Sequence, residues 1–450
     1  MKNLALLLSL LLIIGTSCDK RDEELSGESK IISVKLKSDS EIQNIDVVIS
    51  NDSVKITVPP SVNLSNLTPF FSLDGISISP ASGIAKNFTK PVEYTVTAED
   101  GTQKKYIVSI IHSRHIVYLG TNQKFYALNP LNGKIVWQTP GTLNFNYSHP
   151  TYQNGLVYAG CIDNNMYAFD AMTGDIKWSY QIEGQGIESP PAIALGKIFF
   201  GGNDDYLYAL NALTGKFEWK YKTGANVSTK PLIHNGVVYF GSSDGNIYAL
   251  SAENGAVIWV KQTGTMINAS SPCLYNNTLY LGNRSGTLYA LNLQNGNTIW
   301  TYSTGGVSLE QSSPVISNGI LYISGWYNMS FNQKGSIYAI DASSGSLIWK
   351  SLQLGFSDSP EVAKGRIFIS ADDANFYAVK ASDGTPLWSK NILPNGSNAS
   401  VANDVVYVAS FNNIFAFEAE TGKEKWKLAI IGISGSKPCI VDNNGQMIRD

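Results

Sequence analysis

The stretch that decides the fold is Tyr126-Ala127-Leu128-Asn129-Pro130-Leu131-Asn132-Gly133-Lys134-Ile135-Val136-Trp137, because its pattern returns seven more times. In every copy, Gly lies six positions after the Ala and Trp lies four positions after the Gly. The tryptophans of the eight copies are separated by 41, 41, 40, 41, 49, 39 and 38 residues; they are Trp137, Trp178, Trp219, Trp259, Trp300, Trp349, Trp388 and Trp426. A period of about 40 residues that holds four short strands is typical of a β-propeller blade. The number of copies predicts eight blades.

Each repeat divides into four predicted strands. In the sixth repeat, we expect a first strand and tight turn at Ser313–Gly319, followed by strands at Ile320–Ser324, Ser336–Asp341 and Ser346–Trp349. The small Ala of the third strand leaves room beside it, so the large Trp ring can fill the space between neighbouring blades. We therefore expect the eight tryptophans to be structural docking residues and not a surface for ligands.

The two ends of the repeat region complement each other. The first repeat begins near His115 and lacks the first strand that the other repeats carry, whereas Ser436–Gly445 at the end of the chain has the features of that missing strand. Pairing these two pieces would close the ring and remove an open sheet edge. The sequence thus predicts a propeller, residues 114–450, that the C-terminal strand closes.

The composition of the 450 residues agrees with an all-β protein. Hydrophobic residues make up 43%, charged residues make up 15%, and the formal net charge is -3. Disorder requires low hydrophobicity and high net charge, so that class is excluded. A nearly neutral chain also lacks the positive surface that nucleic acid would require, so we expect no nucleic-acid partner.

Residues 31–113 lack the repeated motif, have their own pattern of strands and turns, and form a separate predicted domain. We expect strands at Ile31–Lys37, Ile45–Ile49, Val54–Val58, Val92–Ala98 and Tyr106–Ile111, with Asp100-Gly101 as a tight turn between the last two. Short strands without helical periodicity predict a small β-sandwich. The segments Phe88–Tyr94 and Glu99–Thr102 resemble the immunoglobulin-like N-terminal modules of Bacteroidota lipoproteins, which implies a spacer between an anchor and the propeller.

The first residues have the pattern of an export signal. Lys2 precedes the apolar run Leu4–Ile14, which is too short to span a bilayer, and small residues lead to Cys18. Residues 1–17 resemble a bacterial lipoprotein signal peptide, which implies that Cys18 is lipidated and that residues 18–30 form a lipidated N-terminus and linker. The resemblance places the protein at the outer membrane, on the periplasmic side or the cell surface. The charge run Asp19–Glu24 resembles a surface-export tag or is a solvated linker.

The repeated Ala, Gly and Trp resemble the tryptophan-docking motif of the pyrroloquinoline-quinone (PQQ) propeller repeat family, over residues 114–450. Five copies also carry the family's Asp or Asn two positions after the Ala, whereas Ser251, Lys380 and Glu418 depart from it. Some members of this family are quinoprotein dehydrogenases. Others bind no cofactor, among them the lipoprotein subunit of the outer-membrane β-barrel assembly machinery.

The enzyme alternative, a quinone-dependent oxidoreductase, fits less well. Quinoprotein dehydrogenases carry adjacent cysteines, a calcium site and long insertions, and no two cysteines are adjacent in this chain. The four histidines form no metal-binding pair, and Glu188 and Glu310, which could act as acid and base, are isolated in polar loops. We expect Cys161, Cys273 and Cys439 to be buried small hydrophobic residues. The sequence therefore predicts no catalytic residue, no metal site and no cofactor.

Two loops carry aromatic residues where the other repeats carry polar ones. They supply the predicted partner-binding residues, which are Trp326, Tyr327 and Phe331 in the sixth repeat and Phe145 and Tyr147 after the first. Apolar rings on loops of a rigid scaffold indicate binding, although such rings can also fold inward to close the channel. We therefore expect a non-catalytic, lipid-anchored binding or scaffold protein, a monomer within a larger complex. Its loop face would bind a protein, possibly in β-barrel assembly, or a glycan.

Overall fold

The protein is built from β-strands. The computed structural model describes residues 26–37, 42, 45–58, 62–112, 115–325, 335–351, 358–371, 373–392, 396–432, 435–442 and 446–447. Strands, turns and loops account for all of these residues, and no helix occurs among them. Consequently, the described part of the chain contains no helical segment long and apolar enough to span a membrane. The predicted all-β class is confirmed. Contacts divide the chain into an N-terminal unit that ends at Ile111 and a second unit that begins at His112.

The N-terminal unit contains two antiparallel sheets. The first sheet pairs β1 (Lys30–Lys37) with β4 (Thr68–Asp74). The second has the order β2 (Asp46–Ile49), β3 (Ser53–Val58), β7 (Gln103–His112), β6 (Val92–Thr97) and β5 (Ser77–Ser79). Strands β4 and β5 were not predicted. Pro69 lies inside β4 and breaks the sequence signal for a strand, but β4 pairs on one side only, where a residue without an N–H is tolerated.

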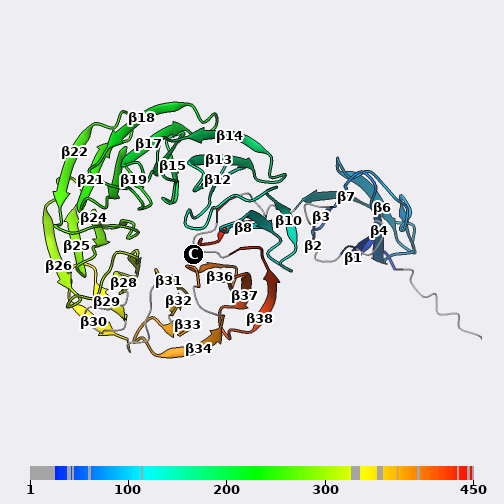
Figure 1. Cartoon of the computed structure of the whole chain (residues 1–450). Coiled ribbons are helices and arrows are strands. Elements are labelled where there is room, and N and C mark those ends of the chain that lie inside the picture. Colours follow the sequence, from blue (N-terminus) through cyan, green and yellow to red (C-terminus); the bar gives the residue numbers. More distant parts are fainter. Residues whose placement is uncertain are drawn as a thin grey trace, which may run out of the picture. The chain divides into compact units, whose positions relative to one another are not determined.

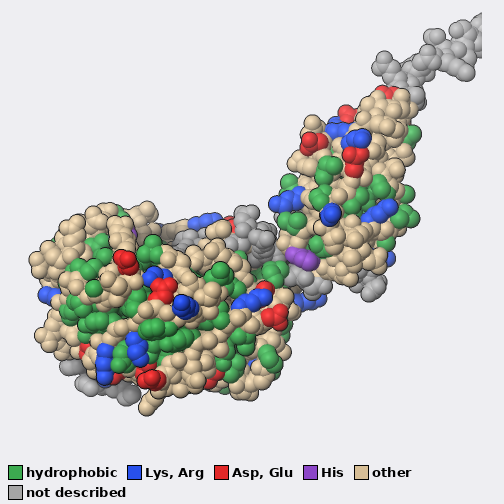
Figure 2. All heavy atoms as spheres, turned by 90° about the horizontal axis from the view of Figure 1, so that it is seen from above, with side chains coloured by type: hydrophobic (Ala, Val, Ile, Leu, Met, Phe, Trp, Pro, Cys, Tyr) green, Lys and Arg blue, Asp and Glu red, His purple; other side chains and the backbone are tan. Residues whose placement is uncertain are grey.

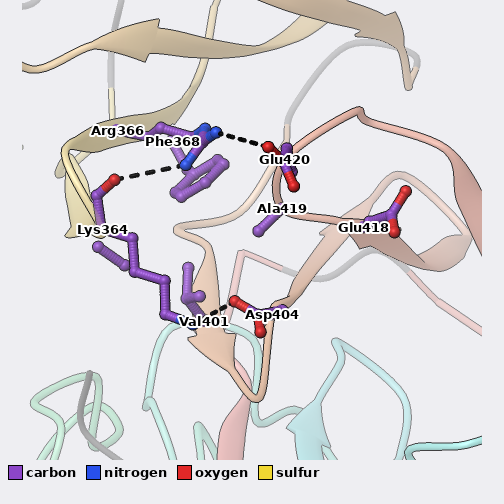
Figure 3. A pocket seen from close by; sticks show the side chains of 9 residues that line it. Lys364, Arg366, Phe368, Val401, Asp404, Glu418, Ala419 and Glu420 are labelled. Carbon is purple, nitrogen blue, oxygen red and sulfur yellow. Dashed lines mark hydrogen bonds and ion pairs between the residues drawn. The ribbon is translucent and has the colours of Figure 1, made fainter.

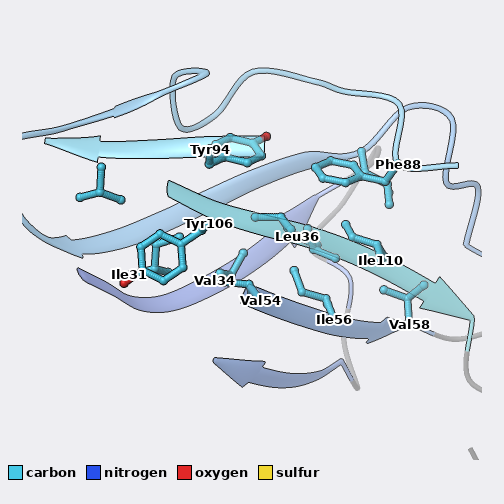
Figure 4. Packing of buried hydrophobic residues seen from close by; sticks show 13 residues of the cluster. Ile31, Val34, Leu36, Val54, Ile56, Val58, Phe88, Tyr94, Tyr106 and Ile110 are labelled. Atoms are coloured by element: carbon cyan, nitrogen blue, oxygen red, sulfur yellow. The ribbon is translucent and has the colours of Figure 1, made fainter. Parts of the chain in front are cut away.

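One hydrophobic core joins these two sheets (Figure 4). Val34 and Leu36 of β1 lie in the same buried cluster as Ile56 of β3 and Tyr94 of β6. The burial pattern of β1 shows why, since Val34 and Leu36 are buried whereas their neighbours Lys35 and Lys37 are exposed. This alternation is the period of a strand with one face on the core.

Eight four-stranded antiparallel sheets follow in the described part of the second unit, arranged in a ring (Figure 1). We number these sheets as blades one to eight. Blade one contains β39 (Cys439–Val441), β8 (Ile116–Gly120), β9 (Phe125–Leu128) and β10 (Ile135–Gln138). Blade two contains β11 (Thr151–Gln153), β12 (Leu156–Gly160), β13 (Asn165–Asp170) and β14 (Ile176–Gln181). Blade three contains β15 (Ala192–Ala194), β16 (Lys197–Gly201), β17 (Tyr206–Asn211) and β18 (Phe217–Lys222). Blade four contains β19 (Leu232–His234), β20 (Val237–Gly241), β21 (Asn246–Ser251) and β22 (Val257–Gln262).

The other four blades repeat this order, from an inner first strand to an outer fourth strand. Blade five contains β23 (Cys273–Tyr275), β24 (Thr278–Gly282), β25 (Thr287–Asn292) and β26 (Thr298–Ser303). Blade six contains β27 (Val315–Ser317), β28 (Ile320–Ser324), β29 (Ile337–Asp341) and β30 (Leu347–Lys350). Blade seven contains β31 (Glu361–Ala363), β32 (Arg366–Ser370), β33 (Asn375–Lys380) and β34 (Pro386–Asn391). Blade eight contains β35 (Ser400–Ala402), β36 (Val405–Ser410), β37 (Asn413–Glu418) and β38 (Glu424–Ala429).

The C-terminal strand closes the ring. Strand β39 pairs antiparallel with β8, and Ile440 lies opposite Val117. All three residues of β39 are buried, so this strand is part of the core and not a loose end. The predicted closure by the C-terminal strand is confirmed.

A bulge places each motif tryptophan opposite the motif alanine. In blade two, Trp178 pairs with Ala168, and the register then shifts so that Ile176 pairs with the next residue, Phe169. The other seven blades show the same shift before their tryptophan. The residue before the Trp is the extra residue of this bulge, which the sequence analysis did not predict.

Each motif tryptophan docks on the next blade around the ring. Trp137 Nε1 donates to the carbonyl oxygen of Ala171 at 2.9 Å, and a Cβ placed on Gly174 would lie only 2.7 Å from the Trp137 ring. The last blade completes the circle, since Trp426 Nε1 donates to Pro130 O at 2.7 Å. The six remaining bonds join Trp178 to Ala212, Trp219 to Ala252, Trp259 to Leu293, Trp300 to Ala342, Trp349 to Ala381 and Trp388 to Ala419.

A tyrosine of the second strand reinforces six of these eight junctions. Tyr118 Oη, for example, donates at 2.8 Å to the same Ala171 carbonyl that accepts from the tryptophan. The equivalent donors in other blades are Tyr158, Tyr239, Tyr280, Tyr322 and Tyr407. Blades three and seven instead carry Phe199 and Phe368 at this position. Two residues earlier these blades carry a cation, Lys197 or Arg366, that reaches the next blade by bonding Glu253 O or Glu420.

Candidate functional site

The connections of the propeller emerge on two opposite faces. Connections between second and third strands, and from each fourth strand to the next blade, lie on one face, which we call the loop face. Turns between first and second strands, and between third and fourth strands, lie on the other, which we call the turn face. The sequence analysis placed its partner-binding residues on the loop face.

Phe145, one of the predicted partner-binding residues, is a core residue. Its side chain is 1% exposed, and its ring centroid lies 5.3 Å from that of Phe125 and 6.0 Å from that of Phe169. Phe145 N donates to Thr121 O, which ties this loop to blade one. The ring has therefore folded inward, as the alternative interpretation of these loops stated, and is not on the surface. Trp326, Tyr327, Phe331 and the predicted lipidation site Cys18 lie outside the described residues.

Tyr147 is exposed and has two apolar neighbours that the sequence analysis missed. The exposed fractions of Tyr147, Phe411 and Ile431 are 56%, 42% and 52%. These three are the large hydrophobic residues that stand exposed on the loop face among the residues with a described structure. Phe411 occupies a second-to-third-strand turn, where blades two, three and four carry Asp163, Asp204 and Asp244. An aromatic residue at a position that is acidic in three other blades was the sequence signal that could have identified Phe411.

Contacts across the closure of the ring hold these three residues in one region, which we call the seam patch. Thr121 Oγ1 donates to Ile431 O at 2.9 Å, and Ile430 N donates to Asn412 O at 2.8 Å, beside Phe411. The Tyr147 ring lies against Gly435, where an added Cβ would be 3.4 Å from it. The seam patch therefore lies where blade eight meets blade one.

The inner ring of the propeller has two chemically different halves. Four hydrogen bonds run from blade four to blade eight, each from the backbone N–H two residues before a first strand to the equivalent side chain of the next blade. They join Lys230 to Ser271, Ser271 to Ser313, Ser313 to Ser359 and Ser359 to Asn398 at 2.8 to 2.9 Å. The equivalent positions of blades one, two and three are Lys437, His149 and Pro190. The polar half is thus internally bonded, whereas Lys437 is the charged residue at the equivalent positions of the other half.

His149 is held in its neutral form. Its pKa falls from 6.5 to about 3, chiefly because burial disfavours the charged imidazolium, and the positive charges of Lys437 and Lys230 lower it further. Lys437 also reaches past blade eight to Glu361 of blade seven, with Nζ and Oε2 2.6 Å apart. His149 is therefore a packed inner-ring residue and not a base that is ready to accept a proton near neutral pH.

The described residues do not fit a quinone with its calcium ion. They contain no group of three or more His, Cys, Asp or Glu side chains that could hold a metal. Cys161, Cys273 and Cys439 lie in blades two, five and one, and no two of them are adjacent in the sequence. Glu188 and Glu310 belong to different connections. Burial raises the pKa of the Glu310 carboxyl, and Arg284, at 3.9 Å, partly opposes that shift.

Two clefts open between blades on the turn face. The cleft between blades seven and eight has a volume of about 250 Å³ and carries the charged side chains of Lys364, Arg366, Asp404, Glu418 and Glu420 (Figure 3). These charges pair with one another, since Arg366 contacts Glu420 at 3.7 Å and Lys364 contacts Asp404. The cleft between blades four and five has a volume of about 300 Å³ and is lined by polar and aliphatic residues, among them Asn235, Asn277 and Ile258.

Comparison with known families agrees with this geometry. Residues 98–194, 182–336 and 333–435 match the family model described as "Outer membrane protein assembly factor BamB". The chain belongs to this family. Residues 31–110 match a second model, described as "SGBP, N-terminal". No curated protein matches the chain.

Solved structures show the same fold at low sequence identity. BamB from Moraxella catarrhalis superposes with a TM-score of 0.56 at 18% identity, over 67% of this chain and 95% of that chain. The computationally designed Ika8 protein gives 0.56 at 14% identity, over 70% and 93%. The quinohemoprotein alcohol dehydrogenase ADHIIG from Pseudomonas putida HK5 gives 0.54 at 16% identity, over 71% and 69%. Since proteins as different as an alcohol dehydrogenase and a designed protein share this fold, the likeness defines the propeller and not its activity.

Proposed function

We propose that this chain is a non-catalytic scaffold, anchored to the outer membrane by lipid on Cys18, that binds a partner protein on the loop face of its propeller. The observation that carries the proposal is the seam patch. Tyr147, Phe411 and Ile431 expose apolar side chains at one place on a face whose other described connections expose no large hydrophobic side chain. Exposed apolar groups on a rigid scaffold favour a protein interface, and Tyr is enriched where binding energy concentrates.

The tryptophan junctions support a binding role over a catalytic one. Eight Trp Nε1 bonds lock each blade to the next, so the loops are presented by a stiff ring. A stiff platform lowers the ordering cost of association because little of the surface must be fixed on binding. Trp326, Tyr327 and Phe331, which lie outside the described residues, remain proposed partner-binding residues. The family match makes a component of β-barrel assembly the partner to test first.

A site-specific crosslinker tests the proposal. A photoreactive residue at Tyr147 or Phe411, introduced in living cells, should capture a barrel-assembly component. The same residue at Ser285, an exposed loop-face position of blade five, should capture much less of it. Equal capture from all three positions, or none from Tyr147, would overturn the assignment of the seam patch. Competition by a soluble glycan with no protein captured would show that the loop face binds sugar instead.

Reconstitution tests the non-catalytic part. The alternative, a quinone-dependent oxidoreductase, requires PQQ and calcium to be held by the propeller. Adding both should leave the visible difference spectrum flat, because the described residues offer no metal-binding group. A saturable new absorbance band would contradict the proposal.

A further inference from the structure

The outer strands of the propeller carry an unusual charge for this chain. They contain eight lysines and two glutamates, although the whole chain has a net charge of -3. The lysines are Lys177, Lys220, Lys222, Lys261, Lys350, Lys390, Lys425 and Lys427, and the glutamates are Glu218 and Glu424. The circumference of the ring is therefore positively charged relative to the rest of the protein.

The same strands expose large hydrophobic side chains. Ten of them stand exposed on the outer strands of the described propeller: Ile135, Ile176, Phe217, Val257, Ile258, Val260, Ile299, Leu347, Ile348 and Leu387. Lysines on an edge strand protect it from pairing with other chains, which is the structural explanation for such residues. Exposed aliphatic residues on those edges favour association with other chains. Protection of the edge therefore explains the lysines, but it does not explain lysines together with exposed hydrophobic residues.

Blades three and four combine both features most densely. Phe217 of β18 and Val257, Ile258 and Val260 of β22 are 42% to 48% exposed. Figure 2 shows hydrophobic side chains gathered along the rim of the ring, with lysine and arginine side chains beside them. We call the outer edge of β18 and β22 the basic rim.

Among the residues that the structure describes, Lys220, Lys222 and Lys261 of the basic rim form no ion pair with a carboxylate. Glu218, the acidic residue of β18, already pairs with Lys197. Lys220 and Lys222 are exposed, with Lys220 Nζ 4.3 Å from the centroid of the Tyr206 ring, and Lys261 is partly buried on β22. Three lysines and four apolar side chains thus lie on the outer strands of two neighbouring blades.

We propose that the basic rim binds an anionic lipid membrane surface. Lysine ammonium groups pair with lipid phosphates while neighbouring apolar side chains enter the headgroup region, as at other interfacial protein surfaces. Neighbouring blades of an eight-membered ring differ in direction by one eighth of a turn, so one flat surface touches β18 and β22 together. The propeller then stands on its edge, and the loop face stays open to its partner. This inference rests on the membrane location within the proposed function.

Vesicle binding tests the proposal in the full chain carrying Cys18→Ala, so that lipid attachment does not contribute. The chain should sediment with vesicles of phosphatidylglycerol mixed into phosphatidylcholine, at about 0.1 M salt, and much less with phosphatidylcholine alone. Each lysine near an anionic surface contributes about fivefold in partitioning. The triple variant K220Q/K222Q/K261Q should therefore bind roughly 100-fold more weakly. The matched control K90Q/K134Q/K423Q removes three exposed lysines outside the basic rim and should change partitioning by less than about threefold.

The apolar contribution is tested separately by F217S/V260S, which should lower partitioning at least about tenfold while raising its relative dependence on salt. Circular dichroism on every variant shows whether it is folded. Equal loss in the two triple variants, or equal binding to both vesicle types, would overturn the proposal. Lysine-dependent binding of poly-L-glutamate without any sedimentation with vesicles would also overturn it and identify an acidic polypeptide as the occupant. Crosslinking from Tyr147 should survive the rim variants, so failure of this inference is distinguishable from failure of the proposed function.

Discussion

Two glycines of blade four allow the tryptophan junction to be measured by itself. Gly255, in the turn before β22, has φ of 75° and lies under the Trp219 ring; Gly236, in the turn before β20, has φ of 76° and has nothing within 4 Å of an added Cβ. An alanine at either position must adopt the same left-handed backbone, which costs about 1 kcal/mol. Only the alanine at Gly255 also meets a ring.

The additional cost at Gly255 follows from the contact distance. A Cβ there would lie 2.8 Å from Trp219 Cε3, closer than side-chain carbons pack, so the ring or the turn must shift. Overpacking of this kind costs about 1–3 kcal/mol. We therefore expect Gly255→Ala to lower the free energy of unfolding by about 2–4 kcal/mol, and Gly236→Ala by about 1 kcal/mol.

Calorimetry is the assay for this comparison. The propeller runs over 326 residues, from Ile116 to Val441. At roughly 2.1 cal/mol/K of unfolding entropy per residue, 1 kcal/mol corresponds to about 1.5 °C in Tm. Gly255→Ala should therefore lower Tm by about 3–6 °C and Gly236→Ala by about 1.5 °C. In a Trp219→Phe background, which removes Cε3, the difference between the two glycine variants should shrink. Equal losses at both glycines would refute the reasoning that the tryptophan ring, and not the backbone conformation, requires glycine at this position.

Three further predictions concern side chains inside the propeller. The pKa of His149 is about 3 in the folded chain against 6.5 ordinarily, so the unfolded chain binds the proton first and stability falls as pH drops below 6.5. In urea titrations, the free energy of unfolding should fall between pH 7 and pH 5 by up to about 2 kcal/mol more for the native chain than for His149→Gln. Equal losses in the two proteins would contradict the shift in pKa. Phe199→Tyr should raise the free energy of unfolding by about 0.5–1.5 kcal/mol, because its hydroxyl can donate to the Ala252 carbonyl, as the tyrosines of six other blades do to theirs. No gain in urea midpoint would show that the blade-three junction has no room for that bond. Burial raises the pKa of the Cys161 thiol to about 12, so iodoacetamide near pH 8 should label Cys161 only after unfolding, as mass spectrometry of its peptide would detect.

The parts of the fold that were predictable are those that repeat. Trp178 pairs with Ala168 and stands over Gly215, so the three residues that define the motif meet at one junction. Because each junction uses the same three residues, their spacing appears in the sequence eight times. The closure by β39 was predictable for the same reason, because comparison with the other repeats shows that the first repeat lacks a strand.

The features that were not predicted occur where the repeats differ. In blade three, a cation replaces the missing tyrosine hydroxyl, since Lys197 Nζ donates to Glu253 O, and the sequence analysis did not predict this bond. The repeat pattern does not predict that bond, because the bond joins residues 56 positions apart in two different blades. Phe199 lacks the hydroxyl that tyrosine supplies in six other blades. Lys197, two residues earlier on the same face of the strand, supplies a bond to the next blade instead.

Exposure explains why the partner-binding residues were predicted only in part. Phe145 and Tyr147 are two positions apart on one loop, and the sequence analysis assigned them the same role. Phe145 N bonds Thr121 O, which fixes the loop so that the Phe145 ring enters the core between blades one and two and Tyr147 points outward. Which of the two rings turns inward depends on this hydrogen bond to Thr121, which lies in another connection. The sequence of the loop alone does not show it, because the loop contains the same two aromatic residues in either case. The seam patch is therefore a product of ring closure, because its contacts exist only once Ile431 and Gly435 of the last connection lie beside Thr121 and Tyr147 of the first.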